Sequence, residues 1–521
     1  MSCFLRLLLS TSVVASVVSC ARSGGHKDPD TLTVLTESAP KNLDPRFTLD
    51  TQGVKIWRLI FAGLTRVGRD VAMEADVATR WEILDGGRTY VFYLRPDVFF
   101  HDGTPLTSED VAYTYSSILD PAVKSPFRGV FADRLARIET RGPHVIAFHM
   151  KKPIGTFLAD VALGIVPKHR GADLKNFPQA PMGAGPWIFE SWREGEEVRL
   201  RANPRYHDGA PKMAKLALRV VRNEVTRYLE LKAGKADLVQ NGLSPLYLRV
   251  IAGEPSLKVV RAPSILTTYL AFNLRDPLLK DVRVRRAIAH ALDPNELIAQ
   301  KLQGFARPAT GLFAPLHWVY EGSVRRYPHD LALARQLLTE AGYPEPPGGG
   351  PRLRLSYKTS TDKFRVSIAR VLRSQLSRVG IEIDLRPYEW GTFFEDLKGG
   401  NFQLCTLQWA ELEEPDIAHW IFHSKRIPGA GPGGANRGAY QNAAVDALLD
   451  AGQSETDVAK RKVIYGALQK ILADELPYVF LWHEDNIAVA RSDLRDLALM
   501  PNAKFDLLRF VWRAPPPAAA P

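Results

Sequence analysis

Four carboxylates within six residues form the most chemically suggestive feature of the sequence. Glu411, Glu413, Glu414 and Asp416 follow Trp409 in a chain that is otherwise basic. Such a cluster is either a solvated loop or a receptor for a cationic group, because a buried ammonium ion needs a carboxylate partner. We favour the receptor. Trp409 is then either a core residue or a platform for the ligand.

The elements before this acidic turn predict where it lies. Residues 402–409 alternate in the manner of a strand, and they end a strand-helix-strand-helix-strand series. The earlier members are expected at residues 353–357, 364–379, 381–385 and 391–398. This order predicts a parallel sheet with right-handed crossovers. Since open parallel sheets bind ligands beyond the carboxyl ends of their strands, the turn is expected beside a binding crevice.

Arginines are candidates for binding an opposite, negative group, because the guanidinium fork matches a carboxylate. Arg365 and Arg370 begin the expected helix 364–379, and Arg437 lies in the Gly/Pro-rich loop 429–438. The alternative is that these side chains simply face solvent.

The composition is that of a globular protein without a nucleic-acid partner. The 521 residues are 45% hydrophobic and 24% charged, which predicts two to four domains. The formal net charge is +11, but the basic residues form no dense run and no nucleic-acid motif. Cys3 and Cys20 lie near the start of the chain, so the body keeps only Cys405, expected as a buried free thiol.

The N-terminus has the features of a bacterial lipoprotein signal. Arg6 precedes an apolar stretch, residues 7–18, that is too short to span a bilayer. The following Cys20 completes a segment that resembles the lipobox, in which the cysteine is lipidated; a chance cysteine after an ordinary cleavage site is the alternative. We expect a signal peptide at 1–19, a lipid anchor on Cys20, a tether at 20–30 and a periplasmic, membrane-anchored protein of the bacterial cell envelope. A disordered tail is expected at 513–521.

Residues 77–121 resemble the signature region of the family 5 extracellular solute-binding proteins, the peptide- and nickel-type receptors of ABC importers. The matching residues are Trp81, Asp85, Gly86, Tyr90, Phe92, Leu94 and Arg95, then Phe100, His101, Asp102, Gly103, Pro105, Thr107, Asp110 and Val111. Within them, Thr107 and Asp110 predict a helix N-cap with a capping box. Further matching segments extend the resemblance over about residues 31–512: 183–187, 203–206, 234–237, 269–273, 281–288 and 334–343.

This resemblance implies an α/β, two-lobed fold of the type II periplasmic-binding-protein kind with an inserted third subdomain. Lobe I is expected at residues 31–65, 181–272 and 486–512, the inserted subdomain at 66–180, and lobe II at 273–485. Two strands are expected to cross between the lobes, so that the ligand lies in the cleft between them.

The resemblance also implies a monomeric, non-enzymatic receptor, without cofactor or metal, that captures di- or oligopeptides and delivers them to an ABC permease. In peptide-binding members, an Asp after the strand that corresponds to 402–409 pairs with the α-ammonium of the peptide. Leu412 stands at that position here, and Pro415 comes one residue early, so Glu411 or Glu413 is expected to replace the Asp. The expected ligand-binding residues are Trp409, Glu411, Glu413, Asp416, Asn273, Arg365 and Arg437.

Two other functions remain open at this point. A receptor for another cationic solute, such as a metal chelate, would use the same acidic turn. An exported hydrolase would use Ser360 and Lys363, which match S-x-x-K without the motifs that normally accompany it. His101 and Asp102 form a possible catalytic pair, but their place in a turn predicts local hydrogen bonding instead.

Overall fold

The computed structural model describes residues 28–410, 412–429 and 433–515. The expected signal peptide, Cys20 and Glu411 therefore lie outside the described residues. Within the described residues, no helix is both long enough and apolar enough to cross a membrane.

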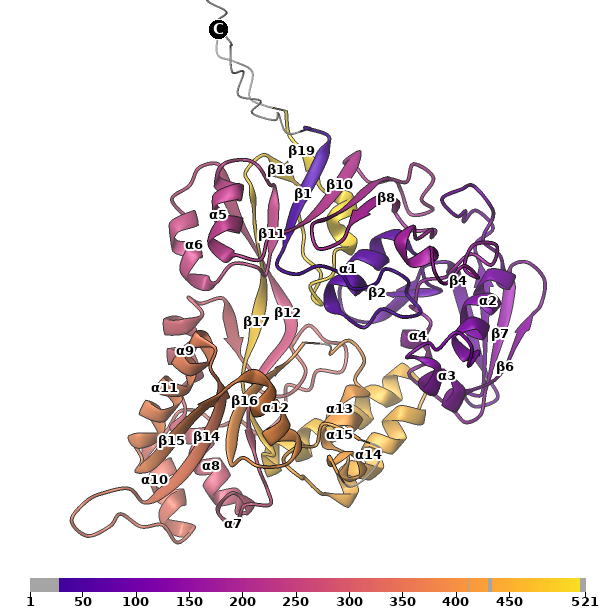
Figure 1. Cartoon of the computed structure of the whole chain (residues 1–521). Coiled ribbons are helices and arrows are strands. Elements are labelled where there is room, and N and C mark those ends of the chain that lie inside the picture. The colour runs from indigo at the N-terminus through magenta and orange to yellow at the C-terminus, as the bar shows by residue number, and fades with distance from the viewer. Residues whose placement is uncertain (1–27, 411, 430–432, 516–521) are drawn as a thin grey trace, which may run out of the picture.

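Two long antiparallel strands, β12 (Leu257–Phe272) and β17 (Tyr478–Arg491), connect two lobes (Figure 1). Their pairing shifts register between Pro263 and Thr267, midway along the crossing. The Ser264 hydroxyl donates a hydrogen bond to the Glu484 carbonyl at this irregularity. Such a bulge bends the strand locally while the pairing continues on both sides. The crossing strands thus hold the lobes together and give the connection a bend at its centre.

Lobe I lies at the top of Figure 1 and contains the first described strand. Its elements are β1 (Thr31–Thr36), α1 (Thr51–Ile60), β8 (Trp187–Arg193), β9 (Glu197–Ala202), β10 (Lys215–Val220), α5 (Glu224–Lys232), β11 (Leu238–Gln240), α6 (Pro245–Ile251), β18 (Leu494–Arg495) and β19 (Trp512–Arg513). β1 pairs in parallel with β10 and β11, and Asp50 caps α1 through a bond from the Gly53 amide.

The inserted subdomain is built around a separate antiparallel sheet in the order β4-β5-β7-β6. Its elements are β2 (Thr65–Val67), β3 (Met73–Ala75), β4 (Ala78–Leu84), β5 (Thr89–Leu94), α2 (Ser108–Leu119), α3 (Arg128–Arg134), β6 (Leu135–Thr140), β7 (Val145–Met150) and α4 (Phe157–Asp160). The Thr107 and Asp110 capping box at the start of α2 is confirmed. Buried aromatic residues of this subdomain form a core of its own.

Lobe II contains the predicted series of alternating strands and helices. Its elements are α7 (Pro277–Lys280), α8 (Val282–Ala291), α9 (Pro294–Lys301), β13 (Ala306–Pro308), α10 (Leu331–Glu340), β14 (Leu353–Ser360), α11 (Lys363–Ser377), β15 (Ile381–Tyr388), α12 (Trp390–Lys398), β16 (Leu404–Trp409), α13 (Ile417–Phe422), α14 (Ala443–Ser454) and α15 (Val458–Glu475). β14 pairs in parallel with β15 and β16, which confirms the predicted parallel sheet.

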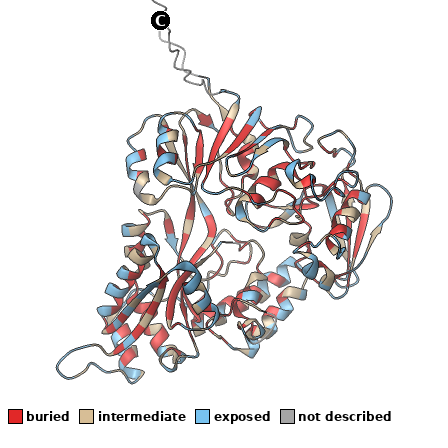
Figure 2. Cartoon of the chain, viewed as in Figure 1, coloured by how far each residue is buried: buried red, intermediate tan, exposed pale blue. Residues whose placement is uncertain are grey.

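A continuous sheet passes through both lobes in the order β15-β14-β16-β12-β17-β11-β1-β10-β9-β8. In lobe II, β16 lies between two cores: Leu404 belongs to the core on one face, and Cys405 and Leu407 belong to the core on the other. Buried residues line the sheet and exposed residues the outer helix faces in Figure 2. Cys405 is a buried free thiol, as expected, and burial raises its pKa to about 12.

The C-terminal segment is ordered further than expected. Arg513 lies in β19, which pairs with β18, and its guanidinium bonds to Asp493 and Asp237 at 2.7 Å each. The prediction that the disordered tail begins at residue 513 is therefore wrong, because Arg513 is held by two carboxylates and by the pairing of β19 with β18. Residues 516–521 lie outside the described residues.

A buried ion pair fixes the loop that leads into α1. Arg46 and Asp44 are both fully buried, and their Nη2 and Oδ2 atoms are 2.7 Å apart. Arg46 also donates to the Gly171 carbonyl (2.9 Å) and the Ser117 hydroxyl (3.2 Å), both in the inserted subdomain. The pair therefore ties lobe I to the inserted subdomain and sets the start of α1.

We predict that Arg46→Met lowers the free energy of unfolding by about 3–5 kcal/mol, because it leaves the Asp44 carboxylate buried without its cation. The measurement is urea denaturation. The matched control is Arg386→Met, which breaks the exposed pair with Asp384 and should cost less than about 1 kcal/mol. Equal effects of the two substitutions would contradict this role of the buried pair.

Candidate ligand-binding cleft

A cleft of ≈ 740 Å³ lies between the lobes and is lined by both of them and by the inserted subdomain. Lys55 of α1 and Lys504 contribute from lobe I. Arg134 of α3 and Asp160 of α4 contribute from the inserted subdomain. Lobe II contributes the acidic turn after β16, and Leu266 lines the cleft at the bulge of β12. The acidic turn thus lies at the binding crevice, as the strand-end argument predicted.

Two of the carboxylates in the acidic turn already have cationic partners. The Glu413 Oε1 is 2.6 Å from the Lys504 Nζ, which is an ion pair across the cleft between lobe II and lobe I. Glu414 pairs with Arg461 of α15. Burial raises the pKa of Glu414, and the Arg461 cation opposes that shift. These two carboxylates therefore have structural partners before any ligand arrives.

Among the described carboxylates of the acidic turn, Asp416 is the one without a cationic partner. Its carboxylate accepts hydrogen bonds from the Gln453 amide at 3.1 and 3.3 Å and has no ion pair with a described residue. Asp160 lies close enough for the two charges to interact. Burial raises the pKa of Asp160 above its usual value, Arg134 opposes the shift, and Asp416 adds to it. Asp416 and Asp160 thus form a negative region between lobe II and the inserted subdomain.

Lys55 lies on the lobe I wall of the cleft and is a cation without an ion-pair partner among the described residues. Its side chain is half-buried, and its Nζ lies 5.2 Å from the centre of the Phe505 ring. Burial lowers the pKa of the Lys55 ammonium, the Glu37 carboxylate partly opposes this shift, and the Lys504 charge adds to it. The sequence analysis missed Lys55, Lys504 and Asp160, because they lie far from the acidic turn in the chain.

Trp409 and Arg437 lie together next to the cleft wall. The Trp409 ring stacks on Tyr269, with centroids 6.0 Å apart and planes at 10°. The Arg437 guanidinium lies 5.7 Å from the Trp409 ring and 5.0 Å from Phe394. Among the described residues, neither Trp409 Nε1 nor Arg437 Nε has a hydrogen-bond partner. Ala410, the next residue after Trp409, lines the cleft.

The structure does not bring Asn273 or Arg365 to this wall. The Asn273 amide donates to the Gly400 and Phe402 carbonyls at 2.8 Å, beyond the opposite end of β16 from Trp409. Arg365 donates to the Thr406 carbonyl at 3.4 Å and lies over the Trp390 ring. Asn273 thus shapes the loop before β16, and Arg365 extends from α11 to contact α12 and β16.

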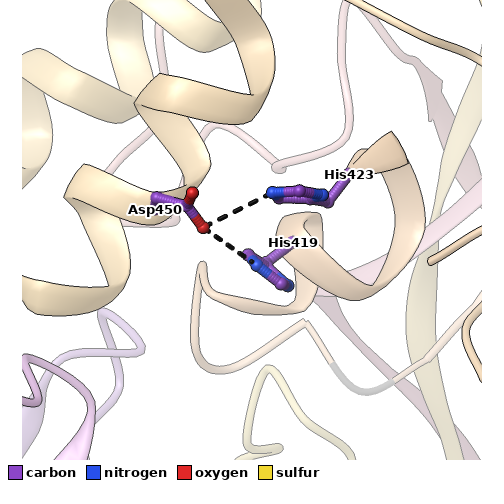
Figure 3. Close-up of side chains that lie close together, drawn as sticks. All are labelled: His419, His423 and Asp450. Atoms are coloured by element: carbon purple, nitrogen blue, oxygen red, sulfur yellow. Dashed lines mark ion pairs between the residues drawn. The ribbon is translucent and has the colours of Figure 1, made fainter. Parts of the chain in front are cut away.

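Two histidines at α13 and an aspartate on α14 lie close together in lobe II. Figure 3 shows His419 and His423 facing Asp450 of α14; each Nε2 is 3.4 Å from the same Asp450 Oδ1. Their ligand atoms lie within 4.8 Å of one another, close enough to hold a metal ion. However, His423 Nδ1 accepts the Lys425 amide at 3.0 Å, so a neutral His423 carries its proton on Nε2. A protonated Nε2 has no lone pair to offer a metal ion, and it makes no hydrogen bond to a described residue. We assign the cluster to packing of α13 on α14.

The residues of the enzyme alternatives have other surroundings. Ser360 is buried at the end of β14, whereas Lys363 is exposed on α11. Asp102 accepts hydrogen bonds from Thr104, which confirms the predicted local bonding, whereas His101 Nε2 lies 3.1 Å from the Gly185 carbonyl, a partner distant in the chain.

His317 is a buried histidine next to the backbone of the acidic turn. Burial lowers the pKa of His317 to about 4, and the backbone of Glu413 and Leu412 partly opposes the shift. Its Nδ1 accepts a hydrogen bond from the Val319 amide at 3.2 Å. Protonation of this ring therefore places a positive charge under the turn.

We predict that acid destabilises the protein through His317. Between about pH 6.5 and pH 4 the unfolded imidazole binds a proton that the folded one does not, so stability falls as the pH falls through this window. His317→Gln should lose less stability than the wild type between pH 7 and pH 4.5, by about 2 kcal/mol in urea denaturation. Exposed His329→Gln is the control. An unchanged pH dependence in His317→Gln would contradict the prediction.

Comparisons with known proteins agree with this geometry. AppA of Bacillus subtilis (strain 168), an oligopeptide-binding protein, is 28% identical over 507 residues, which cover 93% of this chain and 91% of AppA. The structure of AppA with a nonapeptide gives a TM-score of 0.72 at 26% identity, over 93% of this chain and 99% of that chain. Di/tripeptide-binding protein 2 of Pseudomonas aeruginosa (strain UCBPP-PA14) is 26% identical over 516 residues, 92% of this chain and 94% of the relative. NikZ from Campylobacter jejuni in complex with Ni(L-His) gives a TM-score of 0.76 at 25% identity, over 94% and 100% of the chains.

The fold and the cleft define a two-lobed binding protein of the type II periplasmic class. Residues 72–426 match the family described as "Bacterial extracellular solute-binding proteins, family 5 Middle", and the chain belongs to this family. The family is one of extracellular receptors and not of enzymes.

Proposed function

We propose that this protein captures peptides in the cleft between its lobes and delivers them to an ABC permease. The single observation that carries the proposal is the ≈ 740 Å³ cleft, whose charged residues come from both lobes and from the inserted subdomain. The similarity to AppA and to a di/tripeptide-binding protein supports a peptide as the ligand. In this proposal the protein binds its ligand and does no chemistry on it, and neither Ser360 nor Lys363 has a catalytic role.

The α-ammonium of the peptide binds Asp416 in this proposal, with Asp160 on the facing subdomain. An ammonium ion that leaves water needs a carboxylate partner, and Asp416 is the described residue of the acidic turn without a cation. Glu413 has its own partner in Lys504, so its proposed role is to hold the lobes together across the cleft. Glu411 remains a candidate for the same ammonium, and Trp409 with Arg437 over its ring remains a candidate contact at the end of β16.

Closure of the lobes would follow from the crossing strands. The bulge between Pro263 and Thr267 is a place where β12 can bend, and Leu266 at this bulge lines the cleft. We propose lobe boundaries near residues 65, 180, 272 and 485, with Cys20 as the lipid anchor on the bacterial cell envelope and a monomer as the working form. Mass spectrometry of the molecules that denaturation releases from purified protein would identify the solute. A metal chelate in place of peptides would contradict the proposal.

We predict that Asp416→Asn weakens binding of a free-amine peptide by about 10- to 100-fold, because it removes a charge-assisted hydrogen bond. Binding of the N-acetylated peptide should change less than about 3-fold, because that ligand carries no ammonium ion. Titration calorimetry measures both affinities. Exposed Asp384→Asn is the matched control, and Glu411→Gln tests the residue outside the described part of the chain. An equal loss for the free and the acetylated peptide would refute the role of Asp416.

A further inference from the structure

We propose that Lys55, with Lys504 beside it, forms a receptor for a negatively charged group of the ligand, most simply a carboxylate. This inference rests on the proposed function, because it assigns the second end of the same ligand. It replaces Arg365, Arg370 and Arg437, the three arginines that the sequence suggested for this task.

Among the described residues Lys55 has no ion-pair partner, although the charge of Glu37 acts on it from beyond ion-pairing distance. It is half-buried and lines the cleft, yet among the described residues no carboxylate lies within ion-pairing distance of it. Its Nζ contacts the face of the Phe505 ring, 5.2 Å from the centroid. A lysine ammonium that loses part of its water without a partner gains most when an anion arrives. Lys55 therefore has the position and the chemistry of a ligand contact.

The other cations on the cleft walls have partners. Arg134 pairs with Asp160, and Lys504 pairs with Glu413. An ammonium group carries three donors, and the bond to Glu413 uses one of the donors of Lys504. Lys504 is also near enough for its charge to act on Lys55. A carboxylate bound at Lys55 can therefore reach a second ammonium group at Lys504.

The rest of this wall suits a ligand that is apolar as well as charged. Leu49, which is 69% exposed, and Val54 line the cleft next to Lys55. On the opposite wall, Trp420 is 41% exposed and lies beside Asp416. The cleft thus offers an unpaired ammonium on lobe I, an unpaired carboxylate on lobe II and apolar surface between them, which matches a zwitterion with apolar side chains.

The test uses the full mature protein and Ala-Leu-Ala, as the free acid and as the C-terminal amide, in titration calorimetry. The wild type should bind the acid about 10- to 100-fold more tightly than the amide. Lys55→Gln should lose this preference with little change in affinity for the amide, and Lys55→Arg should keep it. Exposed Lys175→Gln is the matched control and should behave like the wild type.

Two results would overturn the Lys55 assignment and leave the peptide function standing. The wild type could bind acid and amide equally, or Lys55→Gln could weaken both to the same extent. If the wild type binds neither peptide, the proposed function fails, and hexanoate then tests the anion site by itself. A thermal shift with hexanoate that Lys55→Gln abolishes supports the site, and no shift in the wild type overturns it.

Discussion

The pairing of β12 with β17 is the constraint on which the rest of the molecule depends. These strands belong to both lobes at once, so every residue of the cleft is positioned relative to them. Their pairing continues through the connection with two register shifts, one at the bulge near Ser264 and one between Thr268 and Tyr269. A pair of hydrogen-bonded strands resists stretching and sliding, but it bends at such an irregularity. The lobes therefore keep their register while the width of the cleft can change.

The charges on the cleft walls follow from this arrangement. A carboxylate or ammonium group at a half-buried position needs compensation, and most of the groups around the cleft find it within the protein. Glu413 with Lys504, Glu414 with Arg461 and Asp160 with Arg134 are such pairs. Among the described residues that line the cleft, Asp416 and Lys55 have no ion-pair partner, and they lie on lobe II and lobe I. Charged groups that have no partner within the protein are free to pair with opposite charges on a ligand, and such pairing gives a receptor specificity.

The acidic turn illustrates how far reasoning from the sequence reaches. Alternation in residues 402–409 and the preceding series of strands and helices located the turn at the end of β16, because parallel sheets leave their strand ends facing the crevice. The sequence did not show which carboxylate of the turn is free to bind a ligand. Glu413 and Asp416 differ by their partners, and those partners come from a segment near the C-terminus and from α14.

The sequence by itself determined the α/β architecture, the capping box of α2, the buried Cys405 and the position of the acidic turn, because each depends on neighbours close in the chain. It also carried the family resemblance, through motifs in residues 77–121. Only the tertiary structure decided which charged side chains form ion pairs and which have no partner. Lys55, Lys504, Asp160 and Asp416 come from four distant parts of the chain, and the pairing of ions depends on separations in space that no local pattern encodes.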